Sequence, residues 1–192
     1  MTVLLIAGSP SDRSRSAALL DSISHRLKTR GANVERLLIR DLSPQALLLA
    51  DTSHLSVRRA IEQVARARAV VIATPVYKAA YSGVLKVFLD LLAQNALQGK
   101  TVLPLATGGS PHHMLALDYA LRPVLHAVGA SDVLPGVYAT DAQVHKLPES
   151  GYTLLPELAS RLFSAVESLQ AAALPPSAGF APVAFADVRI SS

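Results

Sequence analysis

The sequence VLLIAGSPSDRSRS, residues 3–16, joins an apolar run to a loop of hydroxyl and guanidinium side chains. Val3–Ala7 has the length and the continuous apolarity of a strand that is buried on both faces. Apolar residues then recur at helical spacing from Ser16 to Arg30, and Gly31 ends the predicted helix. A strand that leads through such a loop into a helix is the opening unit of a parallel α/β sheet.

Strands and helices alternate along the rest of the chain in the same way. Further strands are predicted over Asn33–Arg40, Ala69–Thr74, Thr101–Thr107 and Asp132–Thr140, and further helices over Ser56–Arg68, Gly83–Ala93, His113–Val128 and Thr153–Ala173. Pro75 is expected to close the third strand, and Pro123 to interrupt the helix over 113–128. Five such units predict a flavodoxin-like α/β fold, in which a doubly wound, five-stranded parallel sheet of order 2-1-3-4-5 carries helices on both faces.

Composition indicates a globular domain and argues against several other classes of protein. Of the 192 residues, 51% are hydrophobic and 17% charged, which favours a packed core over disorder. The net charge of +4 is spread along the chain and aromatic residues are 5%, so we expect no nucleic-acid partner. We also expect no membrane partner, because no apolar run approaches the roughly 18 residues of a transmembrane helix. The absence of cysteine excludes disulfides and thiolate chemistry.

Domain limits and location follow from the two ends of the sequence. We expect one domain over residues 1–174 and a flexible C-terminal tail over 175–192, which begins with Pro175, Pro176 and Ser177. The first residues lead directly into the apolar run, with no basic leader before it. A cytoplasmic location is therefore expected.

The loop over Gly8–Ser16 has the chemistry of an anion site. A helix N-terminus offers unpaired N–H groups and a partial positive charge, and this loop adds serine hydroxyls together with Arg13 and Arg15. Of the three glycines of a Rossmann fingerprint only Gly8 is present, and the G-K-[ST] of a P-loop is absent. A loop rich in hydroxyls and poor in glycine suits a terminal monophosphate. The alternative is ordinary helix capping by Ser14 or Ser16.

Two more loops leave the carboxyl ends of predicted strands, where α/β sheets bind ligands. TPVYKAAYSGVLK, residues 74–86, can present backbone N–H groups and a tyrosine face to a flat ring, although its tyrosines could equally be packing residues. TGGSPHH, residues 107–113, permits close backbone approach at Gly108 and Gly109. We expect no metal site, because His112 and His113 are adjacent and have no carboxylates nearby. The sequence has no G-x-S-x-G motif, so it gives no indication of a serine hydrolase of the α/β type.

With these loops, the chain resembles the NADPH-dependent FMN reductases, and among them the reductases of two-component alkanesulfonate monooxygenase systems. The resemblance depends on IAGSP and SRS in the first loop, ATPVYKAAYSGVLK at 73–86, ALQGKTVLPLATGG at 96–109 and LALDYALRPVL at 115–125. It covers most of residues 1–145. It implies a cytoplasmic homotetramer that uses FMN and NADPH and supplies reduced flavin to a monooxygenase.

The resemblance also implies which residues bind the cofactors. Three groups would hold FMN: Ser9, Ser14, Arg15 and Ser16 at the phosphate, Pro75, Val76, Tyr77 and Lys78 beside the isoalloxazine, and Thr107, Gly108, Gly109 and Ser110 at its other edge. Arg13 and Arg15 are candidates for the additional phosphate of NADPH, and Lys78 for a cation near the N1–O2 edge of the flavin. No catalytic residue is expected, because hydride transfer belongs to the two cofactors.

Tyr119 receives a role of its own from the resemblance. In the sulfonate-linked reductases the matching tyrosine is an insertion that forms a π-helical turn at the tetramer interface, where flavin behaves as a released substrate. Pro123 lacks the N–H that would bond to the carbonyl of Tyr119, so a disturbed helix is expected here. The alternative is a simple proline kink with Tyr119 in the core.

Two other functions remain open at this point. The first is a quinone or metal-ion reductase of the same superfamily that keeps FMN as a prosthetic group. The second is a flavodoxin-like electron carrier or a non-catalytic FMN-binding module, although flavodoxins are typically acidic and this chain is basic.

Overall fold

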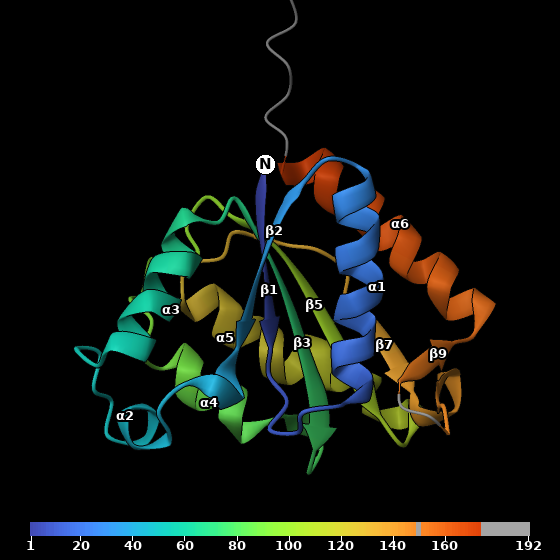
Figure 1. The fold of residues 1–192 in the computed structure, drawn as a ribbon, viewed down its shortest axis with the longest axis horizontal. Helices are drawn as coiled ribbons and strands as arrows, with labels where there is room; N and C mark the ends of the chain where they lie inside the picture. Colours follow the sequence, from blue (N-terminus) through green and yellow to red (C-terminus); the bar gives the residue numbers. More distant parts are fainter. Residues whose placement is uncertain (149–150, 174–192) are drawn as a thin grey trace, which may run out of the picture.

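The computed structural model describes residues 1–148 and 151–173 and shows a central sheet between two layers of helices (Figure 1). The strands are β1 (Thr2–Ala7), β2 (Asn33–Leu38), β3 (Ala69–Tyr77), β4 (Ala80–Tyr81), β5 (Thr101–Gly108), β6 (Asp132–Val133), β7 (Val137–Thr140), β8 (Val144–Lys146) and β9 (Tyr152–Leu154). The α-helices are α1 (Arg15–Thr29), α2 (Pro44–Leu48), α3 (Leu55–Arg66), α4 (Gly83–Leu89), α5 (Arg122–Ala127) and α6 (Pro156–Ala173). Shorter helical turns are η1 (Ile39–Asp41), η2 (Pro111–Leu115), η3 (Ala116–Leu121) and η4 (Asp141–Gln143).

The main sheet has the order β2-β1-β3-β5-β6, and β7 continues the outer position of β6 beside β5. All of these pairs are parallel, with registers such as Val3 beside Ala69 and Ala69 beside Thr101. In chain order these are the five predicted strands, so the flavodoxin-like order 2-1-3-4-5 is confirmed. The central strands are buried because helices cover both faces of the sheet.

Each face of the sheet has its own hydrophobic core. On one face, Leu4 and Ile6 of β1 pack with apolar residues of α3, α4 and α5. On the other face, Val3 and Leu5 pack with α1 and α6. Figure 1 shows the two layers, with α1 and α6 to one side of the strands and α3, α4 and α5 to the other. The arrangement leaves the carboxyl ends of the strands as the edge where loops meet.

Pro75 does not close the third strand as expected, because β3 continues through it to Tyr77. The carbonyl of Ala73 accepts a bond from Gly8 N–H, so the backbone polar groups of Ala73 face β1. Residues two apart in a strand have the same orientation, which directs the nitrogen of Pro75 to that side as well. Because β1 ends at Ala7, the missing N–H costs no bond in the sheet.

The fifth strand, predicted to be continuous over 132–140, is split into β6 and β7. Leu134 N–H donates to the carbonyl of Val102, so Val102 and, two residues on, Pro104 orient their backbone polar groups toward this strand. Pro104 has no N–H to donate there. The pairing resumes at Val137, beside Leu105, with one more residue on the outer strand than on β5. Pro104 on β5 and Pro135 within the interrupted stretch both lack an N–H, which accounts for the break between β6 and β7.

Other differences lie in the connections. The segment predicted as a helix over 113–128 is divided into 3₁₀, π and α turns. Residues 144–154, which include the start of the predicted terminal helix, contain the β8–β9 hairpin, and α6 begins at Pro156. The short helix α2 was not predicted. The expected tail over 175–192 lies outside the described residues.

Candidate functional site

The first wall of the site is the N-terminus of α1. Ser14 is the N-cap, and its hydroxyl accepts a hydrogen bond from Ala17 N–H at 3.1 Å. The hydroxyl of Ser16 lies 3.1 Å from that of Ser14, while the buried Ser9 hydroxyl accepts from Ser11 N–H at 3.2 Å. The capping alternative is therefore realised at Ser14. Capping and anion binding are compatible, because one hydroxyl satisfies one of several unpaired N–H groups in the first turn.

Close backbone contacts fix the first loop against β3 and α4. Gly8 N–H donates to the carbonyl of Ala73 at 2.8 Å, and its carbonyl accepts from the Ser82 hydroxyl. A Cβ atom on Gly8 would lie 3.0 Å from the Cβ of Leu85 and 3.2 Å from the carbonyl oxygen of Ala73. Glycine is therefore required here, because the loop begins in contact with both neighbours.

The second wall is the end of β3 and its hairpin to β4. Val76 pairs with Tyr81 and Tyr77 with Ala80, which leaves Lys78 and Ala79 as a two-residue turn. Both turn residues have left-handed backbone angles, with φ of 50° and 64°. A two-residue hairpin turn of this kind needs positive φ angles, and this conformation is strained for residues other than glycine. The turn leaves the Tyr77 side chain 49% exposed.

The third wall is the end of β5. A Cβ atom on Gly108 would lie 2.6 Å from the hydroxyl of Tyr138 and 3.3 Å from the Cβ of Val76, so this position also requires glycine. The Tyr138 hydroxyl donates to the carbonyl of Ser110. Burial raises the pKa of Tyr138 above its ordinary value of 10.0, and the negative charge of Asp141 adds to the rise. The phenol therefore stays protonated and keeps donating at neutral pH.

The three walls enclose a cleft of about 240 Å³ at the carboxyl ends of β1, β3 and β5. Nine of the twelve expected FMN-binding residues line it: Ser9, Ser14, Arg15, Pro75, Val76, Tyr77, Thr107, Gly108 and Gly109. This volume is below the roughly 300–1,000 Å³ of most small-molecule sites. A neighbouring groove of about 510 Å³, between α1 and β9, shares Arg13, Ser14 and Tyr152 with the cleft and extends it.

The other three expected residues lie beside the cleft and do not line it. The Ser16 hydroxyl is buried in the first turn of α1. Lys78 is exposed at the tip of the hairpin. The Ser110 hydroxyl accepts from His112 N–H at 3.3 Å and caps η2. The structure thus gives Lys78 no contact with the cleft that would support a cation at the flavin edge.

Two residues of the lining, Asp141 and Tyr152, were not expected, whereas Ser11 belongs to the hydroxyl-rich loop that was predicted to bind an anion. Asp141 directly follows the last strand of the sheet, so the rule that ligands lie beyond carboxyl ends could have indicated it. Its carboxylate pairs with Arg15 at 3.4 Å. Tyr152 comes from β9, and nothing in its local sequence indicated a hairpin that folds back toward the first loop.

Tyr119 lies in the π-helix η3, and its side chain is 79% exposed. Arg122 N–H bonds to the carbonyl of Leu117, five residues back, which is the π pattern. Tyr119 is therefore not a core residue. Because η3 packs against β4, this helix adjoins the hairpin that forms the second wall.

Two general properties concern the described part of the chain. Within residues 1–148 and 151–173, histidine, aspartate and glutamate side chains form no group of three or more arranged for a metal ion. Within the same residues, no helix combines the length and apolarity needed to cross a bilayer.

Comparison with known proteins places the chain in a family. Residues 1–145 match the family model described as NADPH-dependent FMN reductase. The chain is 45% identical over 171 residues to an FMN reductase (NADPH) of Escherichia coli, covering 88% of this chain and 87% of that protein. It is 49% identical over 144 residues to an FMN reductase (NADPH) of Pseudomonas putida, covering 75% and 73%.

A solved structure agrees with these sequence matches. The apo form of an NADH:FMN oxidoreductase superposes with a TM-score of 0.82 at 37% identity, covering 92% of this chain and 91% of that one. With the cleft at the carboxyl ends of β1, β3 and β5, these matches show that the chain belongs to the NADPH-dependent FMN reductase family.

Proposed function

We propose that this chain binds FMN in the cleft as a substrate, reduces it with a hydride from NADPH, and supplies the reduced flavin to a partner monooxygenase. Its family uses FMN and NADPH. The observation that carries the proposal is the shared cleft, in which the anion-attracting end of α1 meets the backbone edges of β3 and β5. One end suits a phosphate and the other suits a flat ring.

In this reading the chain binds and orients, and FMN when bound accepts the hydride. The hydroxyls of Ser9 and Ser14 and the N–H groups of the first turn of α1 bind the phosphate. Val76 and Tyr77 on one side, and Gly108 and Gly109 on the other, border the ring. The required glycines keep the backbone close enough for N–H groups to reach a ring edge. No side chain is needed as an acid or a base.

Arg13 is a better candidate than Arg15 for the additional phosphate of NADPH. The Arg15 guanidinium already donates to the Val144 carbonyl at 3.2 Å and pairs with Asp141. Arg13 borders both the cleft and the larger groove, and its side chain makes no hydrogen bond or ion pair with the described residues. Replacing it by Gln should raise the KM for NADPH about tenfold or more, with little change for NADH, since a hydrogen bond to a charged group contributes about 1.5–3 kcal/mol.

The π-helix supports the proposal that FMN is a substrate that the enzyme releases. In the reductases that the chain resembles, the matching tyrosine accompanies flavin release and a tetramer interface. Here Tyr119 is exposed on η3, beside the hairpin that borders the ring end of the cleft. We propose a homotetramer in the cytoplasm, with η3 at a subunit interface. The resemblance to reductases of alkanesulfonate systems supports a monooxygenase of that type as the partner.

Exhaustive dialysis followed by an NADPH oxidation assay tests this function. A released flavin predicts colourless protein whose activity depends on added FMN. Protein that stays yellow and turns over quinones would support a prosthetic flavin, and Tyr119→Ala should move the enzyme toward that behaviour. If no flavin stimulates NAD(P)H oxidation, the chain is an electron carrier or a binding module.

The location of the site needs a separate measurement. Ser9→Ala removes a buried hydroxyl from the phosphate end and should raise the KM for FMN about tenfold, without changing the KM for riboflavin, which has no phosphate. Ser53→Ala is the matched control, because its exposed hydroxyl bonds to Asp51 away from the cleft. Equal effects of both variants on FMN would refute the assignment.

A further inference from the structure

An acidic side chain lies at the phosphate end of a cleft that otherwise suits an anion. The Asp141 carboxylate lies 3.4 Å from the Arg15 guanidinium, and both residues line the cleft. The same carboxylate is the nearest atom to a Cβ built on Gly109. Asp141 therefore lies between the first and third walls. Its carboxylate faces the edge of the Arg15 guanidinium that could bind a phosphate.

The position of Asp141 is fixed by its surroundings. It follows β7 directly and opens the turn η4, in which the Thr140 and Gln143 side chains form a reciprocal capping box. Thr140 N–H donates to the Gln143 side chain at 3.0 Å, and Gln143 in turn donates to Glu157 of α6 at 2.9 Å. The sheet and α6 thus hold the backbone of the η4 turn, which places Asp141 at the cleft, and the Arg15 guanidinium pairs with its carboxylate.

From this geometry we infer that Asp141 limits the affinity for FMN: it competes with the phosphate for Arg15 and repels the phosphate charge, which keeps the flavin exchangeable. The inference rests on the proposed function, since it needs FMN phosphate at this end of the cleft. A phosphate monoester carries close to two negative charges at neutral pH. In an aqueous cleft, repulsion between a neighbouring carboxylate and this dianion weakens phosphate binding by roughly tenfold.

Asp141 could instead help binding by holding Arg15 in position, and the contacts of Arg15 argue against that role. The Nε of Arg15 donates to the Val144 carbonyl at 3.2 Å, independently of Asp141. Val144 is buried and pairs with Leu154 in the β8–β9 hairpin, so this anchor is part of the fold. Removing the carboxylate should therefore leave the guanidinium in place and free one edge of it for the phosphate.

Asp141→Asn and Asp141→Glu separate charge from shape. We expect Asp141→Asn to lower the dissociation constant and the KM for FMN about tenfold, and to lower kcat if flavin release limits turnover. Asp141→Glu, which keeps the charge, should remain close to the unmodified enzyme. Riboflavin should bind all three proteins equally, because it lacks the phosphate. Asp90→Asn is the matched control, since it also removes one carboxylate from an ion pair, with Lys86 on α4, outside the cleft.

Fluorescence titration of each purified protein with FMN and with riboflavin supplies the constants. The inference is overturned if Asp141→Asn binds FMN within twofold of the unmodified protein, binds it more weakly, or changes riboflavin binding by the same factor. The Ser9→Ala variant distinguishes this failure from failure of the proposed function. If Ser9→Ala weakens FMN binding while Asp141→Asn has no effect, the site stands and the role of Asp141 falls. If neither has an effect, the phosphate is bound elsewhere.

Discussion

At the level of single residues, Gly108 shows how the cleft depends on close approach. A Cβ there would meet the Tyr138 hydroxyl at 2.6 Å, and that hydroxyl is held by the Ser110 carbonyl. We expect Gly108→Ala to lower the free energy of unfolding by about 1–3 kcal/mol through overpacking. Tyr138→Phe removes the clashing oxygen, so Gly108→Ala should cost less in that background. Urea denaturation of the four proteins of this double-mutant cycle gives the coupling, and strict additivity would contradict the contact.

Tyr138 also predicts a pH dependence of stability. Burial, followed by the charge of Asp141, raises the pKa of its phenol above the ordinary 10.0. The native state therefore holds this proton more tightly than the unfolded state does. The resulting stability is fully present below pH 10 and is lost as the pH rises through the native pKa. Tyr138→Phe should show a smaller loss of unfolding free energy as the pH is raised above 10, and parallel curves would refute the assignment.

The residues of the cleft differ in how far the sequence could indicate them. Ser9, Ser14 and Arg15 lie in the loop between an obvious strand and helix, so strand order alone placed them at the ligand edge. Asp141 has the same relation to the fifth strand, but a lone acidic residue carries no pattern. Tyr152 reaches the first loop through a hairpin, where its hydroxyl contacts the Arg13 carbonyl at 3.5 Å. Such a contact between residues 139 positions apart depends on tertiary packing.

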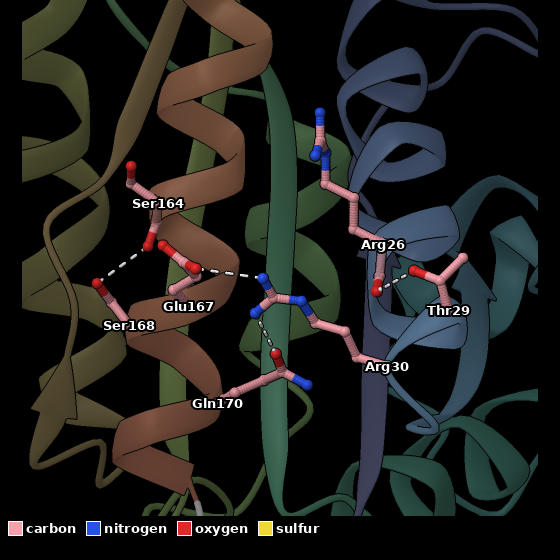
Figure 2. A network of polar contacts seen from close by, with 7 residues as sticks. All are labelled: Arg26, Thr29, Arg30, Ser164, Glu167, Ser168 and Gln170. Carbon is pink, nitrogen blue, oxygen red and sulfur yellow. Dashed lines mark hydrogen bonds and ion pairs between the residues drawn. The ribbon is translucent and has the colours of Figure 1, made fainter.

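At the level of elements, α1 and α6 are joined by more than their apolar faces. The guanidinium carbons of Arg26 and Arg30 lie 5.2 and 4.9 Å from the centre of the Phe163 ring. Figure 2 shows Arg30 between the two helices, directed toward Glu167 and Gln170. Its guanidinium donates hydrogen bonds to Glu167 at 3.2 Å and to Gln170 at 3.0 Å. Cation–π contacts at exposed sites contribute about 0.5–1 kcal/mol each, whereas an exposed ion pair often contributes less.

These contributions predict which of two substitutions on α6 lowers the free energy of unfolding more. Phe163→Leu should lower the free energy of unfolding by about 1 kcal/mol, although leucine is the better helix former. Glu167→Gln should cost less than Phe163→Leu, because it removes a half-exposed ion pair and keeps a hydrogen-bonding side chain. Urea denaturation at low and moderate salt measures both. If Glu167→Gln costs more, the ion pair and not the ring joins the helices.

Pro75 on β3 and Pro104 on β5 show why the ends of strands could not be predicted from the sequence alone. Pro75 was expected to end β3, yet the strand passes through it, whereas Pro104 lies inside β5 beside the point where the neighbouring strand is interrupted. The effect of a strand proline depends on which neighbour its nitrogen faces and on whether that neighbour is still present. Both facts belong to the assembled sheet. The alternation of apolar runs and helical patterns was enough to predict the strands themselves, within a few residues at their ends.

At the level of the whole molecule, strand order explains why three separate loops form one site. The chain reverses its direction of winding between β1 and β3, so the loops after these strands separate and leave a crevice. The loop after β5 closes the crevice from the third side. This consequence of topology was predictable, because it follows from the order of the strands. The additional groove between α1 and β9 was not, since it depends on where the β8–β9 hairpin folds.

The packing of α6 on the sheet determines how much of the chain the fold requires. The core between the sheet and α1 is completed by fully buried Leu158, Leu162, Val166 and Leu169 of α6, and the Ala173 carbonyl accepts from Arg68 at 3.1 Å. Full burial of such side chains contributes roughly 1.5–3 kcal/mol each, so these four together match the roughly 5–15 kcal/mol that stabilises a typical domain.

A chain ending at residue 174 should therefore melt within a few degrees of the full chain and keep its KM for FMN. A chain ending at residue 155 should not fold. Thermal unfolding followed by circular dichroism compares the three, and loss of the cooperative transition in the 1–174 chain would show that residues 175–192 belong to the domain.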